Sequence, residues 1–473
     1  MDLDALLLSR LQFAFTVAFH IIFPSFTIGL ASFLAVLEGL WLLTRKEAFK
    51  TLYLFWVKIF AISFGMGVVS GVVLSYQLGT NWSVFAAVTA PVIGPLLAFE
   101  VLTAFFLEAS FLGVMLFGWR KVGPGLHFAS TALVAVGTLI SAFWIISANS
   151  WMQHPTGHEV LADGSLRAVD WWQVVFSPTF PERFAHMALA AYLTTSLVVG
   201  AASAWRILRS GPSPESSIAL RMAIGMFAVV APLQLVVGDL SGKDVQRLQP
   251  AKLAAIEGFW ETRTEQPFHI LAWPDRALEG NRFELSIPKV GSWITAGSVD
   301  AEVQGLKAFA PEDRPPAAIV FWAFRVMVGL GLLMIALGAW GAWLIWRGRP
   351  WRGRPGRGGP ERSRAFLWSA VAMGPAGFVA VIAGWIVAEV GRQPYVVYGV
   401  LRTADAVSPV GAGQVSASLL AFMVVYAVIF VAGMLYILRL IAQGPQGDDE
   451  DAPVADGQPP GNALAAAPPE HRP

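Results

Sequence analysis

The sequence predicts an all-α, polytopic membrane protein with nine transmembrane helices. Of its 473 residues, 55% are hydrophobic and only 14% are charged, whereas soluble domains carry about 25% charged residues. The chain also contains nine apolar runs of about 20 residues or more, which is the length that a helix needs to cross a bilayer. Helices satisfy their backbone hydrogen bonds internally, so runs of this length are predicted to cross as helices.

The apolar runs divide the chain into four regions. Six spans lie within residues 1–240 and three within 317–441, separated by one large polar loop at 241–316. Residues 442–473 are rich in Pro, Ala, Gly and acidic residues, which predicts disorder. The first run is too long for a cleavable signal peptide, so we expect it to be retained. The predicted spans are 11–43, 52–78, 92–117, 127–151, 184–207, 218–237, 317–346, 366–390 and 415–441.

Lys and Arg in the short loops predict the orientation. They concentrate after spans 1, 3, 5 and 7, and residues 347–364 alone contain seven arginines. Cytoplasmic loops are enriched in these residues. We therefore expect the N-terminus outside, the C-terminus in the cytoplasm and the 241–316 loop outside.

Composition excludes several functions. The net charge of +1 gives no support to a nucleic-acid partner, and the chain has no cysteine. Cysteine-ligated iron–sulfur clusters, c-type haem attachment and disulfides are therefore excluded.

Polar residues inside the spans are the first functional candidates, because ionisable groups at membrane depth are costly. With the predicted orientation, most of them fall in the outer half of the membrane, and Glu108 lies nearer the middle. These residues are His20 in span 1, Glu100 and Glu108 in span 3, His186 at the start of span 5, Arg325 and Met327 in span 7, and Glu389 at the end of span 8.

This set of residue types favours cofactor binding. His, Met and carboxylate side chains can ligate haem iron, and His/Met pairs form six-coordinate electron-transfer haems. After Glu389, residues 391–394 end the helix and supply the cation Arg392 and the amide Gln393, suited to an anionic cofactor. The loop segment from Lys252 to Glu257 is typical of a short amphipathic helix with a solvated polar face.

Three other classes of membrane protein can be compared with the histidines and acids of the spans. A cytochrome b with two bis-His haems needs four membrane histidines, and only His20 and His186 are well placed, with His127 at the inner end of span 4. A haem–copper oxidase needs six and is excluded. A proton-coupled transporter without haem would use the intramembrane acids. It leaves His186 and Met327 unexplained and often shows inverted repeats, which are not evident here.

A series of motifs resembles subunit I of cytochrome bd-type quinol oxidases, in order and at the spacing of that family, from residue 9 to about residue 440. The motifs are Ser9-Arg-Leu-Gln-Phe-Ala-Phe-Thr16 with His20, Gly79-Thr-Asn-Trp82, Glu100 with Phe105-Phe-Leu-Glu108, Phe117-Gly-Trp119, Ala148-Asn149 with Trp151-Met-Gln153, Lys252-Leu-Ala-Ala-Ile-Glu257, Ala323-Phe-Arg-Val-Met327 and Gly391-Arg-Gln-Pro394.

The resemblance implies three haems near the outer face: a low-spin haem b, a high-spin haem b and a haem d. His186 and Met327 match the axial ligands of the low-spin haem. His20 and Glu389 match the ligands of the two high-spin haems, without a separate assignment. Trp385 matches a Trp beside the haems.

The resemblance also implies roles for polar residues. Glu100 matches an acid beside the haem pair, and Glu108 and Ser141 match a proton-entry path. Lys252 and Glu257 match quinol-site residues, which makes the 241–316 segment the quinol-binding loop. Arg325 and Arg392 match cations near haem propionates, with Gln393 beside them in the motif.

For the protein as a whole, the resemblance implies a respiratory terminal oxidase in the bacterial cytoplasmic (inner) membrane. It oxidises quinol outside and reduces O2 to water with cytoplasmic protons, electrogenically and without a pump. The implied partners are quinol, O2, the lipid bilayer, a second large membrane subunit and small single-span subunits.

Two features depart from the usual family pattern. Tyr395 stands where the family motif continues with Trp, and we expect only a local packing change. The quinol loop is of the short form, a branch that includes the cyanide-insensitive oxidases. In this branch a haem b can take the place of haem d.

Overall fold

The computed structural model describes residues 4–348 and 358–445. Within these ranges, nine helical segments are long and apolar enough to cross a membrane, which confirms the all-α prediction. The predicted tail and several arginines after span 7 lie outside the described residues, and the orientation stays a prediction. The spans are α1–α2 (Ala5–Ile22 and Pro24–Thr44), α3 (Glu47–Thr80), α4–α5 (Ser83–Glu100 and Phe106–Phe117), α6 (Pro124–Gln153), α8 (Phe180–Ser210), α9 (Pro214–Leu248), α12 (Ala317–Arg347), α13–α14 (Arg364–Ala372 and Ala376–Val390) and α15 (Ala412–Gln443).

Three of the spans are interrupted along their length. Pro24 begins α2 one residue after α1 ends, because proline favours the first turn of a helix and cannot continue one. A π-helical turn, Val101–Phe105, separates α4 from α5. Pro375 stands between α13 and α14. Each interruption redirects side chains that a straight helix would place elsewhere.

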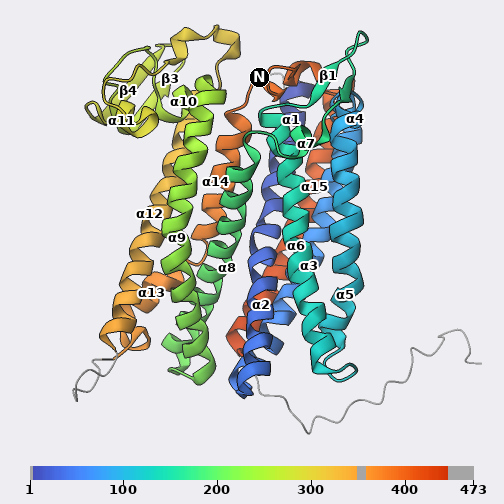
Figure 1. Ribbon diagram of the computed structural model, residues 1–473, viewed down its shortest axis with the longest axis vertical. Coiled ribbons are helices and arrows are strands. Elements are labelled where there is room, and N and C mark those ends of the chain that lie inside the picture. The colour runs from blue at the N-terminus through green and yellow to red at the C-terminus, as the bar shows by residue number, and fades with distance from the viewer. Residues whose placement is uncertain (1–3, 349–357, 446–473) are drawn as a thin grey trace, which may run out of the picture.

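The spans form two packed groups, with α8, α9, α12, α13 and α14 on one side and α1 to α6 with α15 on the other (Figure 1). Helix α2 joins them, since it packs on α3, α6 and α8. The core around α2 and α3 includes Leu34, Leu37 and Phe60, which are fully buried. The candidate site residues therefore lie on helices of both groups.

Short elements cover one end of the bundle, called the outer end here after the predicted orientation (Figure 1). Helix α7 (Trp171–Val175) and the three two-stranded hairpins are absent from the sequence prediction. The loop between α9 and α12 contains α10 (Pro250–Glu257), the hairpin of β3 (Phe268–Asp275) and β4 (Gly280–Ile287), and α11 (Val290–Ala296). The other hairpins are β1 (His158–Val160) with β2 (Leu166–Ala168), and β5 (Tyr395–Val397) with β6 (Leu401–Arg402).

The loop differs from the sequence expectation in two ways. Helix α9 continues to Leu248, past the boundary expected at residue 240. The expected helix at Lys252–Glu257 is present, but its solvated polar face is wrong, because both side chains are buried. Helix α10 packs between α9 and α12, so these two charges need partners within the protein.

Candidate functional site

Glu389, at the end of α14, is the centre of a polar cluster at the outer end. Its Oε1 accepts hydrogen bonds from Asn149 Nδ2 at 3.0 Å and from Gln153 Nε2 at 3.2 Å, both on α6. Its Oε2 pairs with Arg392. The motif residues around positions 149–153 and 389–392 therefore meet in space.

Two further cations join this cluster. Lys252 Nζ donates to Gln153 Oε1 at 2.5 Å. Arg183, at the start of α8, donates to Asn149 Oδ1 and, at 3.2 Å, to Ser150 Oγ. Burial, and then the charges of Arg183 and Arg392, lower the pKa of Lys252 well below its usual value. Lys252 therefore releases its proton more readily than an exposed lysine does.

Arg183 was missed by the sequence analysis, which counted it only as a loop charge. A signal was present, because Arg183 lies three residues before His186 and thus nearly one turn away on the same helix face. Ionisable residues near the end of an apolar run were assumed to face water.

The cluster contains more positive than negative groups. The guanidinium groups of Arg183 and Arg392, together with the amine of Lys252, surround the single carboxylate of Glu389, so two arginines face one acid. Nε and Nη1 of Arg392 are buried without a hydrogen-bond partner. Buried donors without partners are costly, so this site fits a ligand that brings carboxylate groups, as a haem does.

Three candidate iron ligands each lie against a glycine of a neighbouring helix. A Cβ at Gly71 on α3 would lie 3.2 Å from His20 Cε1, and one at Gly238 on α9 would lie 3.3 Å from His186 Cε1. Larger side chains at these positions would fill the space beside the imidazole rings. Similarly, a Cβ at Gly384 on α14 would lie 3.0 Å from Met327 Sδ.

The hydrogen bonds of His20 suit metal ligation. His20 Nδ1 lies 2.9 Å from Ser70 Oγ, whose own proton is directed to the carbonyl groups of Met66 and Gly67. Nδ1 is then the donor, which leaves the Nε2 lone pair free to bind a metal. His186 Nδ1 is buried without a partner.

In the described ranges, no group of three His, Asp or Glu side chains is close enough to hold a metal ion by itself. A haem iron needs only axial protein ligands, because the macrocycle supplies the others. The separate positions of His20, His186, Met327 and Glu389 therefore fit haem better than a bare metal ion. Trp385 is partly buried one turn before Glu389.

Glu100 and Glu108 lie on either side of the π-helical turn. Residues eight apart on an α-helix are about 80° out of phase, and the wider π turn reduces this offset. Ser141 Oγ donates to Glu100 Oε1 at 2.7 Å. The resemblance groups Ser141 with Glu108 in one path, whereas the α6 residue against Glu108 is Gly137, where a Cβ would lie 2.7 Å from Glu108 Cγ.

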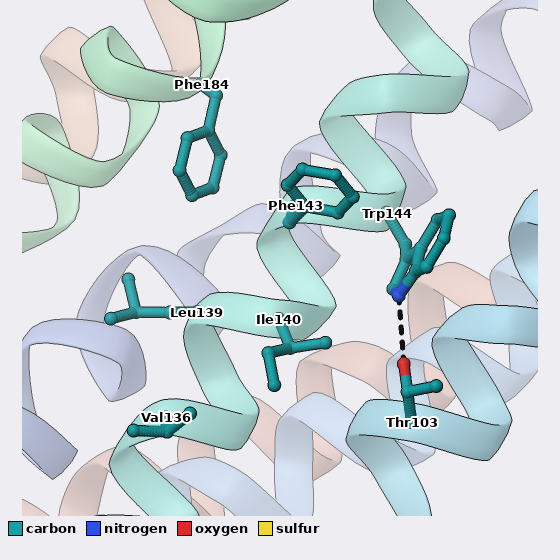
Figure 2. Close-up of a pocket in the computed structure, with 7 residues that line it drawn as sticks. All are labelled: Thr103, Val136, Leu139, Ile140, Phe143, Trp144 and Phe184. Atoms are coloured by element: carbon teal, nitrogen blue, oxygen red, sulfur yellow. Dashed lines mark hydrogen bonds between the residues drawn. The ribbon is translucent and has the colours of Figure 1, made fainter. Parts of the chain in front are cut away.

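An apolar cavity of about 440 Å³ lies between the α4–α5 span, α6 and α8 (Figure 2). Phe143 and Phe184 line it, and Trp144 donates a hydrogen bond of 2.9 Å to Thr103 on its wall. Its lining residue Ile140 precedes Ser141, the partner of Glu100. The cavity is wide open to the surface of the bundle, so it supplies apolar space beside the part of α6 that contacts Glu100.

Glu257 and Arg325 form a separate buried ion pair. Arg325 Nη2 lies 2.8 Å from Glu257 Oε2, and the side chains are 10% and 5% exposed for Arg325 and Glu257. Arg325 also donates to the carbonyl oxygen of His269 at 2.7 and 2.9 Å. The pair therefore joins α10 and β3 to α12, two residues before Met327.

The segment after Arg392 ties the outer loops together. Gln393 Oε1 accepts a hydrogen bond of 2.9 Å from Thr403. Tyr395 Oη donates to Asp313 at 3.3 Å, and Arg402 binds Asp313 at 2.5 Å. Tyr395 thus contributes a polar contact to the end of the 241–316 loop, more than the local packing change expected from the sequence.

Comparisons with known proteins identify the family of the chain. A family model described as cytochrome bd terminal oxidase subunit I matches residues 8–445. The chain is 32% identical to cytochrome bd-II ubiquinol oxidase subunit 1 of Escherichia coli (strain K12), covering 95% of this chain and 99% of that protein. It is 32% identical to cytochrome bd ubiquinol oxidase subunit 1 of Bacillus subtilis (strain 168), covering 96% and 97%.

The fold is similar to a solved structure, the bd oxidase from Geobacillus thermodenitrificans, with a TM-score of 0.85 and 29% sequence identity. The similarity covers 93% of this chain and 99% of that chain. It therefore extends over the whole bundle and the outer loops.

The Glu257–Arg325 pair can be tested by a double-mutant cycle. Removing one partner leaves the other charge buried without its ion-pair partner, so Glu257→Leu and Arg325→Met should each lower stability by about 3–5 kcal/mol. The double variant should lose less than the sum. Thermal unfolding of the purified protein measures this, with Lys289→Met as control, because the Lys289–Glu265 pair is exposed and contributes about 0–1 kcal/mol. Additive losses would contradict the coupling.

Proposed function

The chain belongs to the family of subunit I of cytochrome bd terminal oxidases, and from this premise we propose that its outer end binds three haems and oxidises quinol. The enzyme is a quinol:O2 oxidoreductase. These similarities favour the oxidase over the proton-coupled transporter. The observation that carries the haem proposal is the excess of buried cations around Glu389, with two unpartnered nitrogen atoms of Arg392.

We assign His186 and Met327 to the low-spin haem b, and His20 and Glu389 to the two high-spin haems, a haem b and either a haem d or a second haem b. Bound haem supplies one-electron transfer and O2 chemistry that side chains lack. Arg392 would hold propionates through its unpartnered nitrogens. Arg325 would contribute its Nη1 atom to the same group. In the described structure, Nη1 makes only a long hydrogen bond of 3.5 Å to Ile256 O.

Quinol is oxidised at α10, where Lys252 and Glu257 lie. The pKa of Lys252 is well below its usual value because of burial, so its amine takes a proton from quinol and passes it on readily. Glu257 is held in place by Arg325. Protons from quinol leave on the outer side.

Protons for O2 reduction come from the opposite side through Glu108, then Glu100 and Ser141. Release outside and uptake from the cytoplasm make the reaction electrogenic without a pump. This scheme needs the predicted orientation in a bacterial inner membrane. The exposed apolar face of α15, with Leu420, Val428 and Leu435 exposed, is available to lipid or to a second large subunit, and small single-span subunits are expected as well.

The low-spin site is tested by Met327→Leu and His186→Ala. Each removes one proposed axial ligand, so the low-spin haem signal and quinol oxidation should disappear together. Met334→Leu is the matched control, because Met334 is a buried methionine on the same helix. An unchanged reduced spectrum in either ligand variant would reject the assignment.

The quinol site is tested by Lys252→Ala and Glu257→Gln. Gln is preferable to Ala at position 257, because it keeps a hydrogen bond to Arg325. Both variants should retain all haems and slow quinol-driven O2 uptake by about tenfold or more, while artificial one-electron donors still support it. Lys307→Ala in the same loop is the control. Equal loss with both donors would indicate a folding defect and not a substrate site.

The proton path is tested by Glu108→Gln, which keeps the shape of the side chain but cannot carry a proton. Haems should bind and be reduced by quinol, whereas O2 uptake and membrane charging should fall by about a hundredfold. Glu47→Gln is the control, since the Glu47 side chain is 74% exposed. Normal O2 uptake by Glu108→Gln rejects the relay.

A further inference from the structure

A second titratable cluster lies in the other half of the bundle, towards the end opposite α10. Glu38 on α2 accepts a hydrogen bond of 2.6 Å from Thr131 and lies 2.7 Å from His127 Nδ1, both on α6. Tyr53 on α3 places its hydroxyl 3.0 Å from Thr131 Oγ1. We call Glu38, Tyr53, His127 and Thr131 the inner cluster.

Glu38 and His127 of the inner cluster are buried. Glu38 is 0% and His127 2% exposed. His127 Nε2 is buried without any hydrogen-bond partner. A buried carboxyl group and imidazole are expensive to desolvate, and a purely structural contact would be expected to satisfy both ring nitrogens. Nε2 is therefore the ring atom of His127 that no protein group occupies.

The inner cluster is aligned with Glu108 on two helices. Thr131 precedes Gly137, which packs on Glu108, by six residues of α6, or about 9 Å along the axis. The Tyr53 hydroxyl lies 3.4 Å from the carbonyl oxygen of Met115, and Met115 follows Glu108 by seven residues of α5, or about 10 Å. The cluster thus lies about two turns from Glu108 on the side of α5 that faces α6.

On the other side, the cluster is bordered by aromatic rings. Trp119 packs edge-on against His127, with 4.7 Å between ring centroids, and lies 5.1 Å from Trp41. Arg45 stacks over Trp41 at 5.1 Å. The histidine therefore lies between this rim and Glu108.

We propose that Glu38 and His127 form the proton-loading site that supplies Glu108 during O2 reduction. The proposal rests on the proposed function, because it requires Glu108 to be a proton relay. With Nδ1–H bound to the Glu38 carboxylate, His127 takes a proton from the inner side at Nε2 and releases it from Nε2 towards Glu108. The pair alternates between a net charge of −1 and zero, and the Glu38 hydrogen bond keeps Nε2 as the exchanging atom.

The test compares Glu38→Gln with Glu38→Asp in the complete oxidase. Gln keeps the length and hydrogen bonding of Glu38 but leaves no negative charge to stabilise protonated His127. Glu38→Gln should slow O2 uptake and proton uptake by about tenfold or more, while haem content and haem reduction by quinol stay unchanged. Asp keeps the charge, so Glu38→Asp should be the faster variant. A structural role predicts the opposite order, because Gln preserves packing better than Asp.

The control is Tyr192→Phe, which removes another interhelical hydrogen bond of α2, that between Ser32 and Tyr192 at 3.1 Å. It should leave turnover unchanged. Three results would overturn the proposal: normal proton uptake in Glu38→Gln, faster turnover in Glu38→Gln than in Glu38→Asp, or failure of both variants to bind haem.

Glu108→Gln, measured in parallel, separates this proposal from the proposed function. Slow Glu108→Gln with normal Glu38→Gln rejects only the loading site. Normal turnover of Glu108→Gln rejects the relay and, with it, the loading site.

Discussion

The outer half of the molecule depends on one carboxylate, Glu389, held among two buried guanidinium groups and the amine of Lys252. Arg392 pairs with it directly, while Arg183 and Lys252 reach it through Asn149 and Gln153 of α6. This network joins α6, α8, α10 and α14. Because a buried charge without a partner costs several kcal/mol, the helices are constrained to positions that keep the network complete, and the remaining positive charge is available to an anionic cofactor.

Helix α6 connects this network to the other end of the bundle. It carries His127 and Thr131 against Glu38, Gly137 against Glu108 and Ser141 against Glu100. Asn149 and Gln153 then reach Glu389. Each acid of the proposed proton path therefore meets a residue of the same helix, and the order of contacts along α6 matches the order in which protons would move.

Hydropathy was sufficient to predict the nine spans, because each span is a local run of apolar residues. The same depth argument identified His20, His186, Met327 and Glu389 as candidate ligands. Contacts between helices were not predictable in this way. The hydrogen bond of Ser141 depends on a π turn in a different helix, the role of Arg183 depends on Asn149, and the burial of α10 depends on packing against α9 and α12. Such contacts are set by helix packing, which leaves no periodic signal in the sequence.

The most direct test of the central claim is the haem content of the purified oxidase, measured by visible absorption with its oxidation on exposure to O2. The proposed ligand set predicts about three haems per chain, reduced by quinol and oxidised again by O2. A folded protein with quinol bound at α10 but without haem would contradict the proposal that the cations around Glu389 serve a haem cofactor.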